Sequence, residues 1–155
     1  MFRILFICHG NICRSPMAQY LCDMEIKKRN LQAKIEVSSA ALSREELGNG
    51  VYPPAKKILN ALGINCNSHR ARQITNQDFE DYDLLIVMDE SNLRLIRNFK
   101  GFYSHQDKVY KLLSFAGEDR DIADPWYTGD FRQTKADLDK GLNALFDYLK
   151  EKQVV

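Results

Sequence analysis

FRILFICHGNICRSP, residues 2–16, joins an apolar run directly to a polar loop that contains two cysteines and an arginine. The run RILFI at residues 3–7 is continuously apolar after its first residue, Arg3, which is typical of a strand buried on both faces of a parallel sheet. Ser15 and Pro16 then match the usual N-cap and first position of a helix. This stretch therefore predicts a strand, a short loop and a helix, the repeating unit of an α/β fold.

The rest of the chain continues the alternation of strands and helices. Apolar runs predict further strands at 34–39, 83–88 and 108–113. Helical spacing and end signals predict helices at 16–29, 53–63 and 89–99, a short capped helix after Thr75, and a closing helix from Phe131. Asp89 and Glu90 are expected to begin the third of these helices. No repeat or linker interrupts the pattern, so we expect one α/β domain over residues 1–155, built on a parallel sheet.

The composition is ordinary for a globular domain and excludes several classes of partner. The 155 residues carry 22 basic and 21 acidic side chains, a net charge of +1, so we expect neither nucleic acid nor a membrane as a partner. No apolar stretch approaches the roughly 20 residues of a membrane-spanning helix, and the N-terminus lacks a secretory pattern. Four cysteines at this length do not form a disulfide framework, which favours the cytoplasm.

The loop after the first strand has the residues of a local anion site. Ligands of a parallel sheet bind beyond the carboxyl ends of its strands, where Cys8 is expected. Gly10 and Asn11 tolerate a left-handed backbone, and the N-terminus of the next helix supplies N–H groups with partial positive charge. Arg14 offers paired donors that match phosphate oxygens. A Cys8 thiolate at the floor, hydrogen-bonded by Ser15, would then face a bound phosphorus as a nucleophile.

Two other interpretations of this loop remain open at this point. A cysteine at the end of a buried strand is often an inert core residue. Cys8 and Cys13 would alternatively contribute to a zinc site. Cys22 and Cys66 are isolated, however, and no close pair of cysteine or histidine completes a tetrahedral set. The order of arginine, serine and proline at a strand-to-helix turn favours the anion site.

At these residues the sequence resembles the low-molecular-weight protein tyrosine phosphatases. The similarity runs through four blocks in the same order: FICHGNICRSPMA (6–18), HRARQIT (69–75), YDLLIVMDESNL (82–93) and DPWYTGDF (124–131). The resemblance implies a four-stranded parallel sheet with helices on both faces and a phosphate-binding loop after the first strand. It also implies hydrolysis of phosphotyrosine and of small aryl phosphates through a cysteinyl-phosphate intermediate, without a metal or other cofactor.

The resemblance assigns roles to individual residues. It implies that Cys8 is the nucleophile, Arg14 the phosphate clamp and Asp124 the general acid, which fits the need of an aryl phosphate for a proton on its departing oxygen. Residues matching the phosphate-binding loop are Cys8, His9, Gly10, Asn11, Ile12, Cys13, Arg14 and Ser15. Those matching the hydrogen-bond network behind it are Asn11, Ser15, Ser39 and His69, and those matching the walls around the substrate ring are Ile12, Trp126 and Tyr127.

Three features depart from the pattern of the family, of which Trp126, where tyrosine is frequent, keeps a flat aromatic side chain. After the second strand the family carries an aromatic residue beside the phenyl ring, whereas SAALSREELGNG (39–50) has none and places Glu45 near that position. His9 follows the nucleophile where a small or apolar residue is more usual. One wall of the pocket is therefore either absent or supplied by another residue.

Relatives that share this architecture define the alternative functions. Arsenate reductases need further cysteines, and residues 82–105 contain none. Protein-arginine phosphatases carry threonine four residues after the nucleophile, where this chain has Ile12, an apolar contact suited to an aromatic ring. The non-enzymatic alternative is a phosphate-binding or redox-sensing module, but binding alone would need neither a nucleophile nor an acid. We therefore expect a phosphotyrosine phosphatase: a cytoplasmic monomer that acts on phosphotyrosine-containing proteins and is inhibited by phosphate and vanadate.

The second cysteine of the loop suggests a redox response. Cys8 and Cys13 share one short loop, and an ionised thiol is oxidised first. We expect peroxide to drive a reversible disulfide between them that protects the nucleophile from further oxidation.

Overall fold

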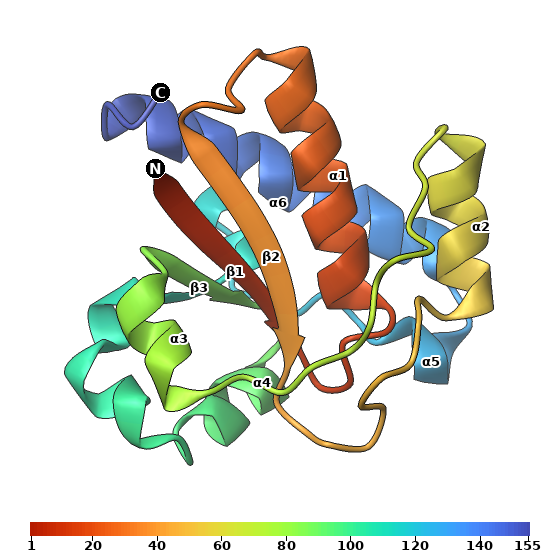
Figure 1. The fold of residues 1–155 in the computed structure, drawn as a ribbon, viewed down its shortest axis with the longest axis horizontal. Helices are drawn as coiled ribbons and strands as arrows, with labels where there is room; N and C mark the ends of the chain where they lie inside the picture. Colours follow the sequence, from red (N-terminus) through yellow and green to blue (C-terminus); the bar gives the residue numbers. More distant parts are fainter.

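A four-stranded parallel sheet in the order β2-β1-β3-β4 forms the centre of the molecule (Figure 1). The computed structural model describes residues 1–155. Its strands are β1 (Phe2–Cys8), β2 (Ile35–Ala41), β3 (Leu84–Val87) and β4 (Val109–Lys111). Cys8 pairs with Ala41 and Val87 pairs with Lys111, so the strands end along a common edge. The loops at this edge build the candidate site.

Helices cover both faces of the sheet, and each face has its own core. The helices are α1 (Arg14–Lys28), α2 (Pro53–Ala61), α3 (Asn76–Asp81), α4 (Glu90–Ile96), α5 (Pro125–Thr128) and α6 (Phe131–Glu151). Ile4 and Phe6 of β1 pack in a core with α1, α2 and α6, whereas Leu5 and Ile7 pack with α3 and α4 on the opposite face. This alternation explains why residues 4–7 are continuously apolar. None of the helices is both long and apolar enough to cross a membrane.

The predicted α/β class, the parallel sheet and the helices on both faces are confirmed. The capping box is also confirmed, because Thr75 and Asp78 each accept a bond from the other's backbone N–H. Gly63 ends the segment of α2 with a left-handed φ of 79°, as its position predicted. The strand predicted at 108–113 is shorter, since the chain turns into a 3-10 helix at Leu112–Ala116.

The start of α1 differs from the prediction. Ser15 is not the N-cap: the helix begins at Arg14, Cys13 occupies the cap position, and no side chain caps the helix. The Ser15 hydroxyl lies instead among polar groups of the preceding loop. The free N–H groups of the first turn are consequently left for that loop and for whatever it binds.

Candidate functional site

The loop from Cys8 to Arg14 curls at the carboxyl end of β1. Asn11 adopts the predicted left-handed backbone, with φ of 61°. Gly10 does not adopt this conformation, so Asn11 alone provides the left-handed residue of the loop. Space at Gly10 is tight, because a Cβ there would lie 3.3 Å from Cγ of Glu46 and that side chain would have to shift slightly.

Hydrogen-bond donors surround the sulfur of Cys8. The residue is 3% exposed, and its Sγ lies 3.0 Å from Oγ of Ser15 and 3.3 Å from the backbone N–H of Asn11, which donates to it. Asn11 Nδ2 also donates to Ser15 Oγ at 2.8 Å, so the hydroxyl proton of Ser15 is free to point at the sulfur. Both groups would stabilise a thiolate more than a neutral thiol.

Asn11 is the centre of the predicted network behind the loop. Its Nδ2 donates to Ser39 Oγ at 3.0 Å, and its backbone carbonyl accepts a bond from His69 Nε2 at 2.8 Å. Two further members were not predicted: Ser39 donates to Gln19 at 2.6 Å, and the backbone N–H of Arg72 donates to Asn11 Oδ1 at 3.2 Å. Gln19 lies one helical turn after Ser15, so its spacing was a signal that sequence analysis missed.

Because His69 is buried, we expect the stability of the protein to depend on pH. Burial lowers the pKa of His69, outweighing the bond to Asn11, which raises it. Protonation is therefore easier in the unfolded chain, and the free energy of unfolding should fall as the pH drops below about 6.5, by at most ~1.4 kcal/mol per pH unit from this group. Urea denaturation at pH 7.5 and 6.0 measures this, with His69→Gln as the comparison. An equal pH dependence in both proteins would contradict it.

Arg14 is fully enclosed and held by acidic and carbonyl oxygens. Its guanidinium donates to Asp89 at 2.6 Å and to the carbonyl of Ile122 at 2.8 Å, and lies 3.4 Å from the Asp124 carboxylate. Burial alone would lower the pKa of Arg14. Cys8 and these two carboxylates together raise that pKa by more than burial lowers it, so the guanidinium stays positively charged. The structure therefore brings the predicted clamp and the predicted acid together.

Asp89 has a second contact that sequence analysis missed. As predicted, it begins α4, because its Oδ1 accepts a bond from the N–H of Asn92 at 2.7 Å. Its other oxygen is the one that holds Arg14. The available signal was its position directly after β3, at the edge where Cys8 ends β1.

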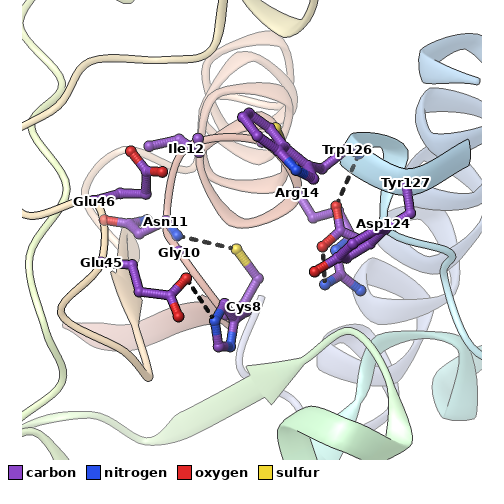
Figure 2. Close-up of a pocket in the computed structure, with 12 residues that line it drawn as sticks. Cys8, Gly10, Asn11, Ile12, Arg14, Glu45, Glu46, Asp124, Trp126 and Tyr127 are labelled. Atoms are coloured by element: carbon purple, nitrogen blue, oxygen red, sulfur yellow. Dashed lines mark hydrogen bonds and ion pairs between the residues drawn. The ribbon is translucent and has the colours of Figure 1, made fainter. Parts of the chain in front are cut away.

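Asp124 lies at the start of α5, a short helix that was not predicted. The carboxylate accepts a bond from the N–H of Trp126 at 3.0 Å, and Pro125 is the first helical residue. Trp126 and Tyr127 are 52% and 84% exposed, which is unusual for large aromatic residues. Figure 2 shows both on the same side of the pocket as Asp124.

The pocket combines the predicted residues with two acidic ones. It is lined by Cys8, His9, Gly10, Asn11, Ile12, Cys13, Arg14, Glu45, Glu46, Asp124, Trp126 and Tyr127. Glu45 and Glu46 lie across Cys8 from the aromatic pair, where the sequence lacks an aromatic residue (Figure 2). His9 is 3.1 Å from Glu45. The missing wall is thus supplied by carboxylates.

The four cysteines are free thiols in this structure, and the arrangement offers no metal centre. Burial first, and then the neighbouring Cys8, raise the pKa of Cys13 to about 12. Burial also raises the pKa of Cys22, which packs in the core. No group of three or more His, Cys, Asp or Glu side chains is placed to hold a metal ion.

The loop before Asp124 is anchored to the end of the sheet. Lys111, the last residue of β4, is 8% exposed, lies 2.8 Å from the Asp121 carboxylate and donates to the Asp119 carbonyl at 2.7 Å. Asp121 also accepts a bond from the N–H of Glu90 at 3.0 Å. Burial alone would lower the pKa of Lys111, but the surrounding carboxylates raise it, so the ammonium stays charged.

This anchor predicts that Lys111 positions Asp124. We expect Lys111→Met to lower kcat/KM for phenyl phosphate by about 10- to 100-fold, because small displacements of a proton donor are costly. An aryl phosphate with a nitro-substituted leaving group, which needs little protonation, should be affected much less. Lys111→Arg keeps the charge and should recover most of the loss. An equal loss with both substrates would indicate general destabilisation instead.

The fold and the loop match one protein family. The sequence model described as "Low molecular weight phosphotyrosine protein phosphatase" matches residues 3–155, and the chain belongs to this family. Low molecular weight protein-tyrosine-phosphatase YfkJ of Bacillus subtilis is 36% identical over 99% of this chain and 100% of its own length. The crystal structure of YfkJ has a TM-score of 0.93 at 32% identity, covering 98% of this chain and 96% of that chain.

Two other relatives extend this comparison. The low molecular weight phosphotyrosine protein phosphatase of Sus scrofa is 37% identical over 82% of this chain and 81% of its own length. The crystal structure of the Drosophila arginine phosphatase DARP has a TM-score of 0.84 at 30% identity, covering 95% of this chain and 97% of that chain. Relatives with two different named activities share this fold. The fold therefore does not identify the substrate, which has to be inferred from the side chains of the pocket.

Proposed function

We propose that this chain is a protein-tyrosine phosphatase that hydrolyses phosphotyrosine through a cysteinyl-phosphate intermediate. The observation that carries the proposal is the position of the Cys8 sulfur: it receives donors from Ser15 and Asn11 in a pocket that also contains Arg14 and Asp124. A nucleophile, an anion clamp and an acid in one pocket are what phosphate-ester hydrolysis requires. Membership of the family and the names of the relatives support this proposal.

In the first step the Cys8 thiolate attacks the phosphorus of phosphotyrosine. The new S–P bond forms as the bond from phosphorus to the phenolic oxygen breaks, and Asp124 in its acid form gives its proton to that oxygen. Arg14 and the N–H groups at the start of α1 stabilise the charge on the remaining phosphoryl oxygens. Tyrosine leaves neutral, and the phosphoryl group stays on the sulfur.

In the second step water releases the phosphoryl group. The Asp124 carboxylate takes a proton from water as the water oxygen bonds to phosphorus, and the S–P bond breaks with its electrons returning to Cys8. The Ser15 hydroxyl, 3.0 Å from the sulfur, stabilises the returning thiolate. Inorganic phosphate leaves, and Asp124 is again protonated for the next substrate. Phosphate and vanadate are expected to inhibit, because both fit the same cradle.

The walls of the pocket favour phosphotyrosine over phosphoarginine. Ile12, Trp126 and Tyr127 line the pocket with apolar and aromatic surface that suits a phenyl ring. The test compares kcat/KM for peptides that differ only in carrying phosphotyrosine, phosphoarginine or phosphoserine. We expect phosphotyrosine to be hydrolysed fastest. Faster hydrolysis of the phosphoarginine peptide would overturn the proposed substrate but not the cysteine chemistry.

The redox response of the loop belongs to this proposal. We propose that peroxide oxidises Cys8 to a sulfenic acid, which Cys13 attacks to form the disulfide with loss of water. Cys13 is 5% exposed and lines the same pocket as Cys8, which supports a reaction between these two thiols. Mass spectrometry after peroxide treatment should find a Cys8–Cys13 disulfide that dithiothreitol reverses. Over-oxidised Cys8 beside an unmodified Cys13 would contradict this.

We also propose that the protein acts as a cytoplasmic monomer. Four free thiols suit a reducing compartment, and a single copy of the chain already contains the nucleophile, the clamp and the acid. Light scattering of the purified protein should give the 17.9 kDa mass of one chain.

A further inference from the structure

Two carboxylates, those of Glu45 and Glu46, lie opposite the aromatic wall of the pocket (Figure 2). Glu45 and Glu46 come from the segment between β2 and α2, and they face the mouth of the pocket across Cys8 (Figure 2). The mechanism uses neither side chain. A phosphotyrosine that enters this mouth would carry its neighbouring residues past the two carboxylates.

These two residues are held at a fixed distance from the phosphate-binding loop. The backbone N–H of Ser43 donates to the carbonyl of His9 at 3.0 Å, and the Ser43 hydroxyl donates to the same oxygen at 2.9 Å. Further along, the N–H of Tyr52 donates to the carbonyl of Ile12 at 2.9 Å. Between these two points Cγ of Glu46 lies close to Gly10, 3.3 Å from where a Cβ of that residue would be. The acidic segment is therefore attached to the loop at both of its ends and at its middle.

Neither the Glu45 nor the Glu46 carboxylate is paired with a permanently charged side chain. Glu46 accepts a hydrogen bond from the neutral side chain of Asn49 at 2.6 Å. The ion-pair partner of Glu45 is His9, which is cationic only when protonated. No lysine or arginine lies within 4.0 Å of either carboxylate, and the neighbouring Arg44 does not line the pocket. The Glu45 side chain is 69% exposed and so is available to a substrate.

We propose that Glu45 and Glu46 make this pocket selective for phosphotyrosine with basic neighbouring residues, an inference that rests on the proposed phosphatase function. The phosphate itself is bound by Arg14 and the helix N-terminus, so the two carboxylates act on the flanking charges. A lysine or arginine beside phosphotyrosine is attracted to them, and an aspartate or glutamate is repelled. At separations of about 6 to 8 Å near a protein surface, each such interaction changes binding by several-fold to about tenfold.

The test uses three peptides that are identical except for the residues on either side of phosphotyrosine: lysine, glutamine or aspartate. We expect kcat/KM to fall in that order, with the lysine peptide at least about tenfold above the aspartate peptide in ~0.01 M salt. The ratio should shrink towards one in ~1 M salt, where charges are screened within about 3 Å. The Glu45→Gln/Glu46→Gln double variant should bring the ratio near one even at low salt.

Each protein is compared only with itself, through the ratio of its lysine and aspartate peptides, so a general change in activity does not affect the result. Glu151→Gln removes an exposed carboxylate at the end of α6, remote from Glu45 and Glu46, and should keep the wild-type ratio. A ratio of one or below in the wild type, or an unchanged ratio in the double variant, would overturn the inference. Failure to hydrolyse even the glutamine peptide would contradict the phosphatase function itself.

Discussion

Replacing Cys8 with serine should abolish turnover, with a loss of about 10⁴-fold or more in kcat for an aryl phosphate. A serine hydroxyl is not ionised at neutral pH, whereas the cysteine sulfur lies among donors from Ser15 and Asn11 that favour its anion. Serine also makes a poorer leaving group in the second step, because an alkoxide has to depart from phosphorus. The substitution thus impairs both formation and breakdown of the covalent intermediate.

The fold and the anion site should survive this substitution. Serine is close in size to cysteine, and Arg14 and the start of α1 are unchanged, so Cys8→Ser should still bind a phosphotyrosine peptide in calorimetry. Cys22→Ala is the matched control. It removes another buried thiol, on the core-facing side of α1, and should retain turnover. Near wild-type hydrolysis by the Cys8→Ser protein would refute the cysteinyl-phosphate mechanism.

Asp124→Asn should lower kcat/KM for poor leaving groups by about 10²- to 10⁴-fold, the usual contribution of general acid catalysis. The first step depends on a proton for the phenolic oxygen, so the loss should grow as the pKa of the departing phenol rises. A series of substituted phenyl phosphates measures this dependence. A loss of equal size for every leaving group would show that Asp124 does not donate the proton.

Comparison with Asp124→Ala separates catalysis from structure. Asparagine is as good an N-cap as aspartate, so Asp124→Asn should keep the bond to the N–H of Trp126 and lose only the charge beside Arg14. Alanine removes the cap of α5 and should cost an additional ~0.5 to 2 kcal/mol of stability. Thermal unfolding of the two variants provides that measurement.

The fold was predictable because local signals and buried runs agreed. Residues 3–7, the capping box at Thr75 and the glycine stop at Gly63 each described a local property that the structure preserves. The start of α1 was predicted wrongly, because the hydroxyl of Ser15 bonds to Cys8 and Asn11 and is not available as a cap. A preference measured over many helices does not include such specific partners in the preceding loop.

The site was predictable only for residues in the loop from Cys8 to Ser15 and for those that the family resemblance assigned. Ile12 and the aromatic pair lie at the pocket where they were expected, and His69 contacts the loop. The two contacts made by Asp89 and Lys111 join side chains that are 75 and 10 residues from their partners. The order of the strands in the sheet decides whether residues so far apart in the sequence lie close together in space. That order cannot be predicted from any local sequence pattern.

The anchored loop before Asp124 has a consequence for how substrates come and go. Ile122 is tied to Met88 on one side and to Arg14 on the other, and Lys111 holds the residues just before it. An acid that is seated before the substrate arrives needs no lid to close over it. We therefore expect a mouth that stays open throughout the cycle, through which a small aryl phosphate and a folded phosphoprotein reach the same chemistry without waiting for the enzyme to move.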